Sequence, residues 1–268
     1  MMIDRELNKY LPKRGKLARA MRYSVFAGGK RFRPLLCVLT AKALGRSPRQ
    51  VLPIAAAIEM LHTFTLIHDD LPAMDNSDLR RGKLACHKKY NEALAILAGD
   101  ALNTLAFEIL AKQSKNAAVI AEIGKAIVAV IEGQIMDMES EKRRINLRRL
   151  YAIHSKKTAA LLAACVRASA VQLKASPKQL SALTNYARHL GLAFQIADDI
   201  LDATATAKRL GKPVRADIKK GFPSVVGIVK SQRLAQREKE SAIRALKMFD
   251  QKANPLRELA EFVVARES

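Results

Sequence analysis

The sequence predicts an all-α protein that forms a single domain over residues 1–268. Hydrophobic residues make up 49% of the 268-residue chain, and the strong helix formers alanine and leucine are prominent among them. Only 12 glycines and 9 prolines are present, so residues that interrupt helices are few. Apolar side chains recur at helical spacing, and no internal repeat indicates a solenoid. A chain of this length is near the upper limit for one hydrophobic core.

A few capping residues divide the chain into its expected elements. Ser47 followed by Pro48 is typical of a helix N-cap with a first-turn proline, and Pro72 should end the helix that they start. Ser176 and Pro177 repeat the pattern later in the chain. The pattern predicts helices over 51–68, 91–111, 117–138, 150–173, 176–202 and from 222 to the C-terminus with a break near 254–255, a basic connector over 141–149 and a lysine-rich loop over 203–221.

Cysteine usage and the N-terminus predict a cytoplasmic protein. Cys37, Cys86 and Cys165 lie far apart and are odd in number, which disfavours a disulfide framework or a zinc site and is typical of a reducing cytosol. The first residues lack the apolar core of a signal peptide. No uninterrupted apolar run reaches the roughly 18 residues that span a membrane, so we expect no membrane insertion.

The formal net charge of +22 admits three kinds of partner: nucleic acid, an anionic membrane surface or a small anionic substrate. The basic residues are spread along the chain, and aromatic residues make up only 5% of it. No basic stripe interleaved with aromatic residues and no zinc-finger motif is present. Binding of nucleic acid as the main function is therefore disfavoured, and we expect no nucleic-acid partner.

Two clusters of aspartates stand out in this basic chain. The first contains Asp69, Asp70 and Asp75 at the end of an apolar helix, and Pro72 requires a turn to bring Asp75 back toward the other two. Carboxylates this dense repel one another unless a cation lies among them. Mg²⁺ prefers such oxygen ligands and fills the rest of its shell with water and substrate phosphates.

The second cluster lies on one face of a helix. Gln195, Asp198, Asp199 and Asp202 fall within an arc of roughly 100° at about 100° per residue, among apolar neighbours. We expect the helix to end here, where its dipole disfavours anions, so a solvated helix end is a weak explanation for the cluster. Two such clusters facing each other would hold a diphosphate between them through metal ions.

Longer motifs surround both clusters. They are GGKRFRP over 28–34, LIHDDLPAMDNSDLRRG over 66–82, AILAGDAL over 95–102, Lys157-Thr158, GLAFQ over 191–195 with the second cluster, and LGK over 210–212. Together they resemble the trans-isoprenyl diphosphate synthases, most closely the bacterial farnesyl diphosphate synthases. The resemblance implies an isoprenoid synthase-type helical bundle around a deep central cavity, a homodimer and dependence on Mg²⁺. The implied reaction condenses isopentenyl diphosphate with dimethylallyl and then geranyl diphosphate to give farnesyl diphosphate and pyrophosphate.

The resemblance also implies a role for each matching residue. Metal binding falls to Asp69 and Asp75 with Asp70 in support, and to Asp198 with Asp199 and Asp202 as ligands or close neighbours. The resemblance implies that the allylic diphosphate and the developing cation are bound or stabilised by Arg80, Lys157, Thr158, Gln195 and Lys212. It implies that isopentenyl diphosphate is bound by Lys30, Arg33, His62 and Arg81. It also implies that the length of the product is limited by Phe64 and Thr65, where an aromatic ring on the cavity wall fills volume that further isoprene units need.

Plainer interpretations exist for several of these residues taken alone. A histidine such as His62 on an apolar helix is more often a core residue, and Phe64 and Thr65 are ordinary core residues. The basic run from Lys30 to Arg33 is compatible with a solvated turn. The preceding Gly28 and Gly29, however, permit close approach of the backbone to an anion.

The sequence departs from the family pattern at two places. Glu132 replaces a glycine and would either disturb helix packing or face outward. The loop after Asp217 is short, and either Lys219 or Lys220 would supply the family's lysine there. Three alternatives stay open: a geranyl or geranylgeranyl product, a catalytically silent partner subunit, and a helical protein that binds anions or nucleic acid.

Overall fold

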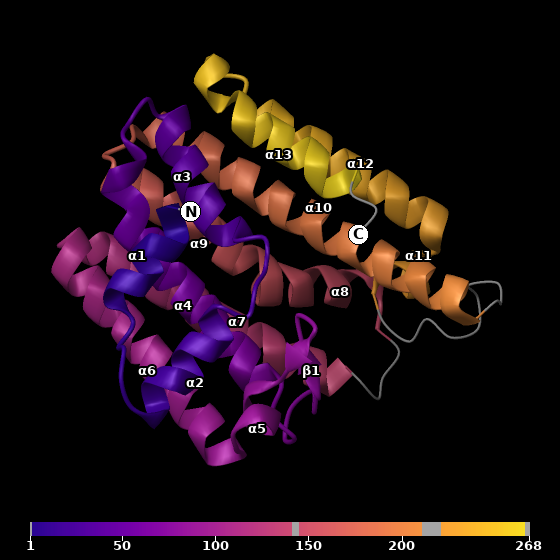
Figure 1. The fold of residues 1–268 in the computed structure, drawn as a ribbon. Helices are drawn as coiled ribbons and strands as arrows, with labels where there is room; N and C mark the ends of the chain where they lie inside the picture. The colour runs from indigo at the N-terminus through magenta and orange to yellow at the C-terminus, as the bar shows by residue number, and fades with distance from the viewer. Residues whose placement is uncertain (1, 141–144, 211–220, 266–268) are drawn as a thin grey trace.

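The computed structural model describes residues 2–140, 145–210 and 221–265, with the side chains of 205–210 outside the description. Within these residues the chain is almost entirely helical, as predicted (Figure 1). The α-helices are α1 (Met2–Tyr10), α2 (Lys16–Val25), α3 (Phe32–Ala43), α4 (Leu52–Asp69), α5 (Cys86–Lys89), α6 (Glu92–Ile109), α7 (Ala117–Ser140), α8 (Leu147–His154), α9 (Ala160–Gln172), α10 (Pro177–Leu210), α11 (Phe222–Val226), α12 (Ile228–Ala245) and α13 (Asn254–Ala265). Short 3₁₀ or π segments are η1 (Pro48–Val51), η2 (Leu110–Ser114), η3 (Ser155–Ala159) and η4 (Gln251–Ala253), and the strands are β1 (Leu79–Arg80) and β2 (Lys83–Leu84).

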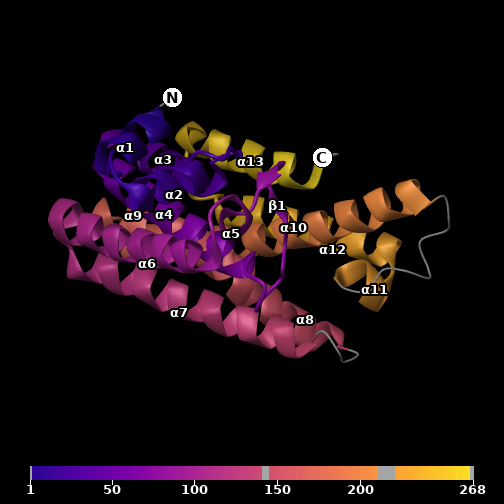
Figure 2. The ribbon, with the colours of Figure 1, turned by 60° about the horizontal axis from the view of Figure 1, so that its bottom comes forward.

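Helix α4 forms the centre of the core. It packs against α3, α6 and α9, while α10 packs against α9 on one side and α12 on the other (Figure 2). Most of α4 is buried, because alanine and branched apolar residues occupy nearly all of its surface up to Phe64. Its last turn leads out of the core, so Asp69 and the following residues emerge beside the packed helices. The core therefore fixes the position of the first aspartate cluster.

Two helix starts test the capping predictions. Ser176 caps α10 as expected, because its hydroxyl accepts from the amide of Gln179 at 3.3 Å and the side chain of Gln179 accepts from the amide of Ser176 at 2.9 Å. This reciprocal arrangement is a capping box. The prediction for Ser47 was wrong in detail: its side chain makes no capping bond, and the 3₁₀ turn η1 precedes α4.

Two predicted boundaries before α10 also need correction. Residues 147–149, expected in a connector, belong to α8, because the side chain of Asn146 accepts from the amide of Arg149 at 2.9 Å and caps the helix. The predicted helix 150–173 is interrupted by the π-helical turn η3, a feature that is often found at functional sites. Apolar periodicity does not distinguish such a turn from regular helix.

Helix α10 continues well beyond its predicted end at Asp202, to Leu210. The segment after Asp202 alternates alanine and threonine, and no glycine or proline interrupts it before Gly211. The hydroxyl of Thr204 bonds back to the carbonyls of Ile200 and Leu201 within the helix. The second aspartate cluster therefore lies within a helix, and the expectation that it sits at a helix end was wrong.

Two helical segments, Pro48–Asp69 and Glu92–Ser114, are long and apolar enough to cross a membrane by length and composition alone. The expectation from uninterrupted runs missed them, because mean hydropathy tolerates isolated polar residues such as Glu59 and His62. The first segment is mostly buried as the core helix α4.

Candidate active site

Four basic side chains that the sequence predicted to hold one diphosphate line a single pocket. Lys30 precedes α3, Arg33 lies in its first turn, His62 comes from α4, and Arg81 comes from the hairpin turn. The pocket has a volume of about 430 Å³, and the ring of Phe194 from α10 forms part of its apolar wall. Packing thus brings together residues from four separate segments of the chain.

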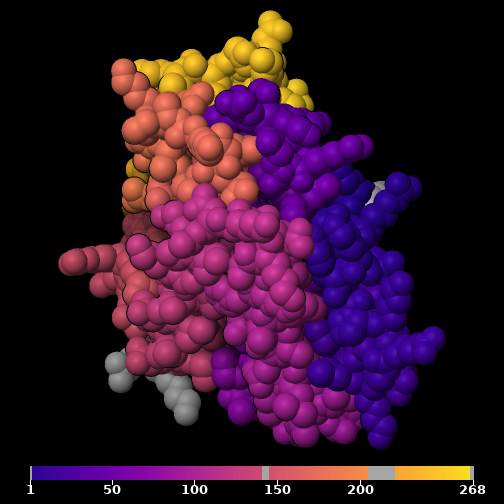
Figure 3. Space-filling view, turned by 90° about the vertical axis from the view of Figure 1, so that its left-hand side faces the viewer, coloured from indigo at the N-terminus to yellow at the C-terminus, as the bar shows by residue number. Residues whose placement is uncertain are grey.

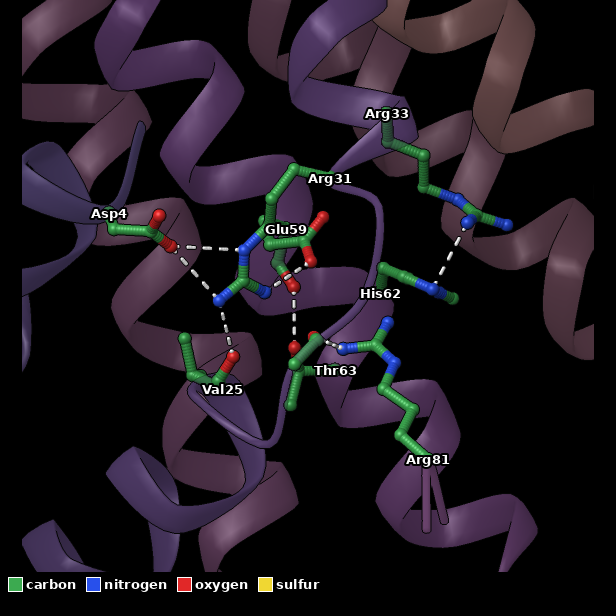
Figure 4. Close-up of polar contacts among 9 residues, drawn as sticks. Asp4, Val25, Arg31, Arg33, Glu59, His62, Thr63 and Arg81 are labelled. Carbon is green, nitrogen blue, oxygen red and sulfur yellow. Dashed lines mark hydrogen bonds and ion pairs between the residues drawn. The ribbon is translucent and has the colours of Figure 1, made fainter. Parts of the chain in front are cut away.

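His62 lies in the pocket as a neutral imidazole. The Nη1 of Arg33 is 3.0 Å from the Nε2 of His62, and this ring nitrogen must accept, since a guanidinium only donates (Figure 4). Burial, together with the charges of Arg33 and Arg81, lowers the pKa of His62 well below its usual range. The Nε of Arg33 is buried and has no hydrogen-bond partner within the described residues. A desolvated guanidinium of this kind is suited to an anionic ligand.

A short hairpin directs the two neighbouring arginines to different partners. Strands β1 and β2 pair with Arg80 opposite Lys83, and the turn residues Arg81 (φ 54°) and Gly82 (φ 75°) both have positive φ, as a type I′ turn requires. Arg81 donates from Nη1 to the carbonyl of Gly28. Arg80 instead points to the first aspartate cluster.

The turn after α4 folds Asp75 back toward Asp69, as the position of Pro72 predicted. The amide of Asp75 donates to the carbonyl of Asp69 at 2.8 Å. The pKa of Asp69 is raised to about 6, chiefly by burial; the charge of Lys157 opposes this rise and that of Asp75 adds to it. The side chain of Gln134 on α7 lies 3.5 Å from Asp75. The nearby charge of Asp75 and the burial of Asp69 thus make this a place where a cation would be stabilised.

Asp70 differs from its neighbours because an arginine engages both of its carboxylate oxygens. Its side chain is 2% exposed and receives the Nε of Arg80 at 3.0 and 3.2 Å on its two oxygens, with a further bond from Nη2. The hydrogen bond to Asp70 is the main cause that raises the pKa of Arg80. Asp70 and Arg80 therefore brace the hairpin against α4.

The π-helical turn η3 presents two predicted residues in different directions. The Nζ of Lys157 donates to Asp137 of α7 at 2.6 Å, and its charge also acts on Asp69. The hydroxyl of Thr158 donates to the side-chain oxygen of Gln195 on α10 at 2.6 Å. The turn η3 therefore acts on the first cluster, at the end of α4, through the charge of Lys157 and contacts Gln195 of α10 through Thr158.

Asp199 in the second cluster binds Phe222, the first residue of α11. One carboxylate oxygen accepts from the amide of Phe222 at 2.9 Å, and the other accepts from the Nε2 of Gln195 at 2.8 Å. The Nε2 of His154 lies 3.4 Å from the same carboxylate, and the His154 ring stacks on Phe222 with centroids 5.5 Å apart. A Cβ on Gly221 would lie 2.7 Å from Asp199. Asp199 thus fastens α11 to α10.

The remaining predicted residues take simpler positions. Asp198 is half-buried and Asp202 is exposed, and both interact with other described groups. Phe64 is buried, with its ring edge-on to His68 at 4.9 Å, and the hydroxyl of Thr65 donates to the carbonyl of His62. Lys212, Asp217, Lys219 and Lys220 lie outside the described residues. Within the described part of the chain, no three His, Cys, Asp or Glu side chains form a ready group for a metal ion.

Glu132, the departure from the family pattern, faces outward and pairs with Lys156 at 2.5 Å. The neighbouring Gly133 is tightly packed, because a Cβ there would lie 2.3 Å from the amide nitrogen of Lys157. We expect Gly133→Ala to lower the free energy of unfolding by about 1–3 kcal/mol, since the overlap must push η3 away from α7.

Gly124 on the same helix is the matched control. Nothing lies within 4 Å of a Cβ at that position, so Gly124→Ala should raise the free energy of unfolding by up to about 1 kcal/mol through helix propensity. Urea denaturation of the two variants measures both effects. Equal stability of the two variants would contradict the close packing of α7 on η3.

Several structural residues of the site were not assigned a role from the sequence. Glu59 binds Arg31, and His154 and Phe222 lie against Asp199. One signal was available for Glu59, because it is the sole acidic residue among the apolar residues of α4 before Asp69. No local pattern links Asp199 with Phe222, since only tertiary packing brings them together.

This chain is similar to prenyl diphosphate synthases in both sequence and structure. The polyprenyl synthetase family model matches residues 14–263. A geranylgeranyl diphosphate synthase of Cyanophora paradoxa is 42% identical over 99% of this chain and 93% of the relative. A farnesyl diphosphate synthase of Geobacillus stearothermophilus is 41% identical over 99% of this chain and 94% of the relative. The crystal structure of an FPP/GFPP synthase from Zymomonas mobilis superimposes with a TM-score of 0.86 at 37% identity, over 98% of this chain and 95% of that one.

The chain therefore belongs to the polyprenyl synthetase family. It has the all-α isoprenoid synthase fold, and it is a prenyltransferase of isoprenoid biosynthesis. The resemblance drawn from the motifs is confirmed. The relatives' names include both farnesyl and geranylgeranyl products, so family membership does not define the product.

Proposed function

We propose that the protein condenses isopentenyl diphosphate with dimethylallyl diphosphate and then with geranyl diphosphate to give farnesyl diphosphate. One observation carries the proposal: a basic pocket lies next to clustered carboxylates. The pocket around Arg33 and His62 suits one diphosphate, and the carboxylates around Asp69 suit the cations that accompany a second. The charge of Asp198 acts on Arg33, so the pocket and the second cluster are within electrostatic range of each other.

The proposed reaction balances without an added oxidant or base. The carbon–oxygen bond of the allylic diphosphate breaks and pyrophosphate leaves with the electron pair. The terminal alkene carbon of isopentenyl diphosphate forms the new carbon–carbon bond, and a proton leaves to the released pyrophosphate. No side chain is required as the final base, and the Nε2 of the neutral His62 already accepts from Arg33.

Mg²⁺ is the proposed cofactor, and Asp69, Asp75 and Asp198 are its proposed ligands. These donors are all carboxylates, which suits the preference of Mg²⁺ for oxygen. Asp70 and Asp199 are engaged by Arg80 and by Phe222, so we assign them supporting roles. Asp202 lies on the same helix face as Asp198 and is proposed as a nearby partner of the metal site. When bound, Mg²⁺ neutralises the charge that develops on the leaving pyrophosphate.

Side chains from η3 and α10 are proposed to handle the allylic substrate. Lys157, oriented by Asp137, grips the leaving diphosphate together with Arg80, and Lys212 contributes according to the family resemblance. The hydrogen bond from Thr158 to Gln195 aligns two oxygen dipoles that stabilise the allylic cation.

Phe64 is proposed to limit the length of the product. Replacement of Phe64 by alanine removes a buried ring one turn and a residue before Asp69, so we expect products at least one isoprene unit longer. Phe107→Ala on α6 is a control for loss of a phenyl ring elsewhere and should leave product length unchanged. Mass spectrometry of the products measures the effect. An unchanged product from Phe64→Ala would mean that another residue, such as Thr65, forms the limiting wall.

The protein is proposed to act as a homodimer through α6 and α7. Val128, Ile131, Ile135 and Met138 form an exposed apolar stripe at helical spacing along α7, and Leu97 on α6 is 57% exposed. Helices α6 and α7 occupy the middle of one face of the molecule (Figure 3). A second copy of this chain would bury this stripe.

We expect Ile131→Glu to convert a dimer into a monomer, because it places charges at the centre of the stripe. Sedimentation velocity measures the change in mass. Val229→Glu on α12 is the control, since Val229 is 63% exposed and lies outside the stripe. A dimer that persists in Ile131→Glu but dissociates in Val229→Glu would place the interface elsewhere.

One assay tests the proposed function as a whole. The protein is incubated with isopentenyl and geranyl diphosphates with and without Mg²⁺, and the products are identified by mass. A fifteen-carbon product that requires Mg²⁺ supports the proposal, and a twenty-carbon product favours a geranylgeranyl diphosphate synthase. The absence of any metal-dependent product would favour a silent partner subunit.

We propose that the reaction takes place in the cytoplasm, where the buried thiols of Cys37, Cys86 and Cys165 remain reduced.

A further inference from the structure

Arg31 lies between two residues of the basic pocket, yet its side chain points into the protein (Figure 4). Its Nη1 donates to Glu59 at 2.7 Å, and its Nε donates to Asp4 at 3.1 Å. Its Nη2 donates to the carbonyl of Val25 at 2.8 Å and lies 3.1 Å from Asp4. All three guanidinium nitrogens are therefore engaged with the protein, and Arg31 differs in this respect from Arg33.

The backbone of Arg31 is held in an uncommon conformation. Arg31 is the N-terminal flanking residue of α3 and has φ 49° and ψ 38°, in the left-handed region that residues other than glycine rarely adopt. This conformation turns the chain between Lys30 and Arg33. The side-chain bonds of Arg31 to α1, α2 and α4 hold the turn in place.

Glu59 creates an electrostatic problem that Arg31 solves. The Glu59 side chain is 2% exposed, lines the same pocket as Arg33, and lies one helical turn before His62. An uncompensated carboxylate there would repel a diphosphate, and burial would make this repulsion strong. The ion pair with Arg31 compensates the charge of Glu59, which also acts on the nearby guanidinium groups of Arg33 and Arg81.

We propose that Arg31 is a positioning residue for isopentenyl diphosphate: it compensates the buried charge of Glu59 and fixes the turn that presents Lys30 and Arg33. This inference rests on the proposed function of the pocket. The Asp4–Arg31–Glu59 ion pairs thereby couple the N-terminal helix α1 to recognition of one substrate. Arg31 also lines the pocket, but its three guanidinium nitrogens are already bonded to Asp4, Glu59 and Val25, so its proposed role is to position other residues.

The test compares KM values for the two substrates in three variants. Arg31→Met removes the compensating charge and should raise KM for isopentenyl diphosphate about tenfold or more, with KM for geranyl diphosphate within about threefold of the wild type. Glu59→Gln removes the buried negative charge of the carboxylate and should leave KM for isopentenyl diphosphate unchanged or lower it. Arg31→Met/Glu59→Gln should recover the part of the loss that comes from the uncompensated charge, and it no longer buries an uncompensated carboxylate, so it remains informative if Arg31→Met does not fold.

Arg167→Met is the matched control. Arg167 forms a bidentate pair with Glu122 at 2.6 and 2.8 Å, away from the pocket, so its loss should lower the melting temperature without changing either KM. Isothermal titration of isopentenyl diphosphate gives an independent measure of binding for each variant.

The outcomes separate the two levels of inference. An active wild-type protein in which the double variant binds no better than Arg31→Met, or in which Glu59→Gln raises KM more than about threefold, contradicts the role of Arg31. The same holds if both KM values rise together in Arg31→Met. A wild-type protein that makes no product contradicts the proposed function instead.

Discussion

Asp69→Asn is expected to lower kcat for prenyl transfer by about a thousandfold, because a metal ion contributes several kcal/mol of charge stabilisation in a reaction of this kind. Asparagine has nearly the shape of aspartate and keeps an oxygen donor, but it carries no charge. We therefore expect kcat to fall and the required Mg²⁺ concentration to rise, with little change in the fold. Steady-state kinetics over a Mg²⁺ titration measure both quantities.

The same substitution should not destabilise the protein. Burial raises the pKa of Asp69 to about 6, so the folded state holds a proton more tightly than the unfolded state does. For a raised carboxylate pKa the stability falls as the pH rises from the unfolded value to the folded one, and at neutral pH the charged side chain is unfavourable. The neutral side chain introduced by Asp69→Asn should therefore leave the melting temperature unchanged or higher.

Asp78→Asn is the control for Asp69→Asn. Asp78 belongs to the same turn, but its side chain is 72% exposed and pairs with Lys88 at 2.9 Å. An exposed ion pair contributes little, so kcat should stay within about twofold of the wild type. Equal losses in the two variants, or a full-rate Asp69→Asn enzyme, would contradict the metal role of Asp69.

The adjacent residues Asp198 and Asp199 are expected to respond differently to the same change. Asp198→Asn should lower kcat by about a hundredfold or more, because a proposed metal ligand loses its charge. Asp199→Asn should cost about tenfold at most. Its oxygen can still accept from the amide of Phe222, and the hydrogen bonds through Gln195 and Thr158 can reverse direction when the Gln195 amide turns over.

Asp199→Ala separates anchoring from metal binding. The variant leaves the buried amide of Phe222 without its acceptor, which costs about 1–3 kcal/mol. Hydrogen exchange over α11 should therefore be faster in Asp199→Ala than in Asp199→Asn or Asp198→Asn. If Asp199→Asn instead raises the Mg²⁺ requirement as much as Asp198→Asn does, Asp199 is itself a ligand.

Helix positions could be read from the sequence where the signal was local. The apolar run of α4 and the capping box of Ser176 gave correct starts and ends within a few residues. The end of α10 could not be predicted from the sequence, because the alanines and threonines after Asp202 are compatible with either helix or loop. Apolar periodicity does not reveal the π turn η3 either, nor does it reveal that Gly133 of α7 packs closely against this turn.

The candidate site was predicted in its composition but not in its internal partnerships. The four residues of the basic pocket and the folding back of Asp75 followed from motifs and from Pro72. The family resemblance gave Asp70 a supporting role, but the sequence offered no reason to expect that Arg80 would be its partner.

The amino-acid sequence by itself determined the all-α class, the two aspartate clusters and the family, because helix formers, periodicity and motifs are properties of neighbouring residues. Only the tertiary structure decided which charged residues already have protein partners. Asp70 is bound by Arg80, Asp199 by Phe222, and Glu59 by Arg31. These pairs join residues that are 10, 23 and 28 positions apart, so their contact depends on how the helices and turns pack.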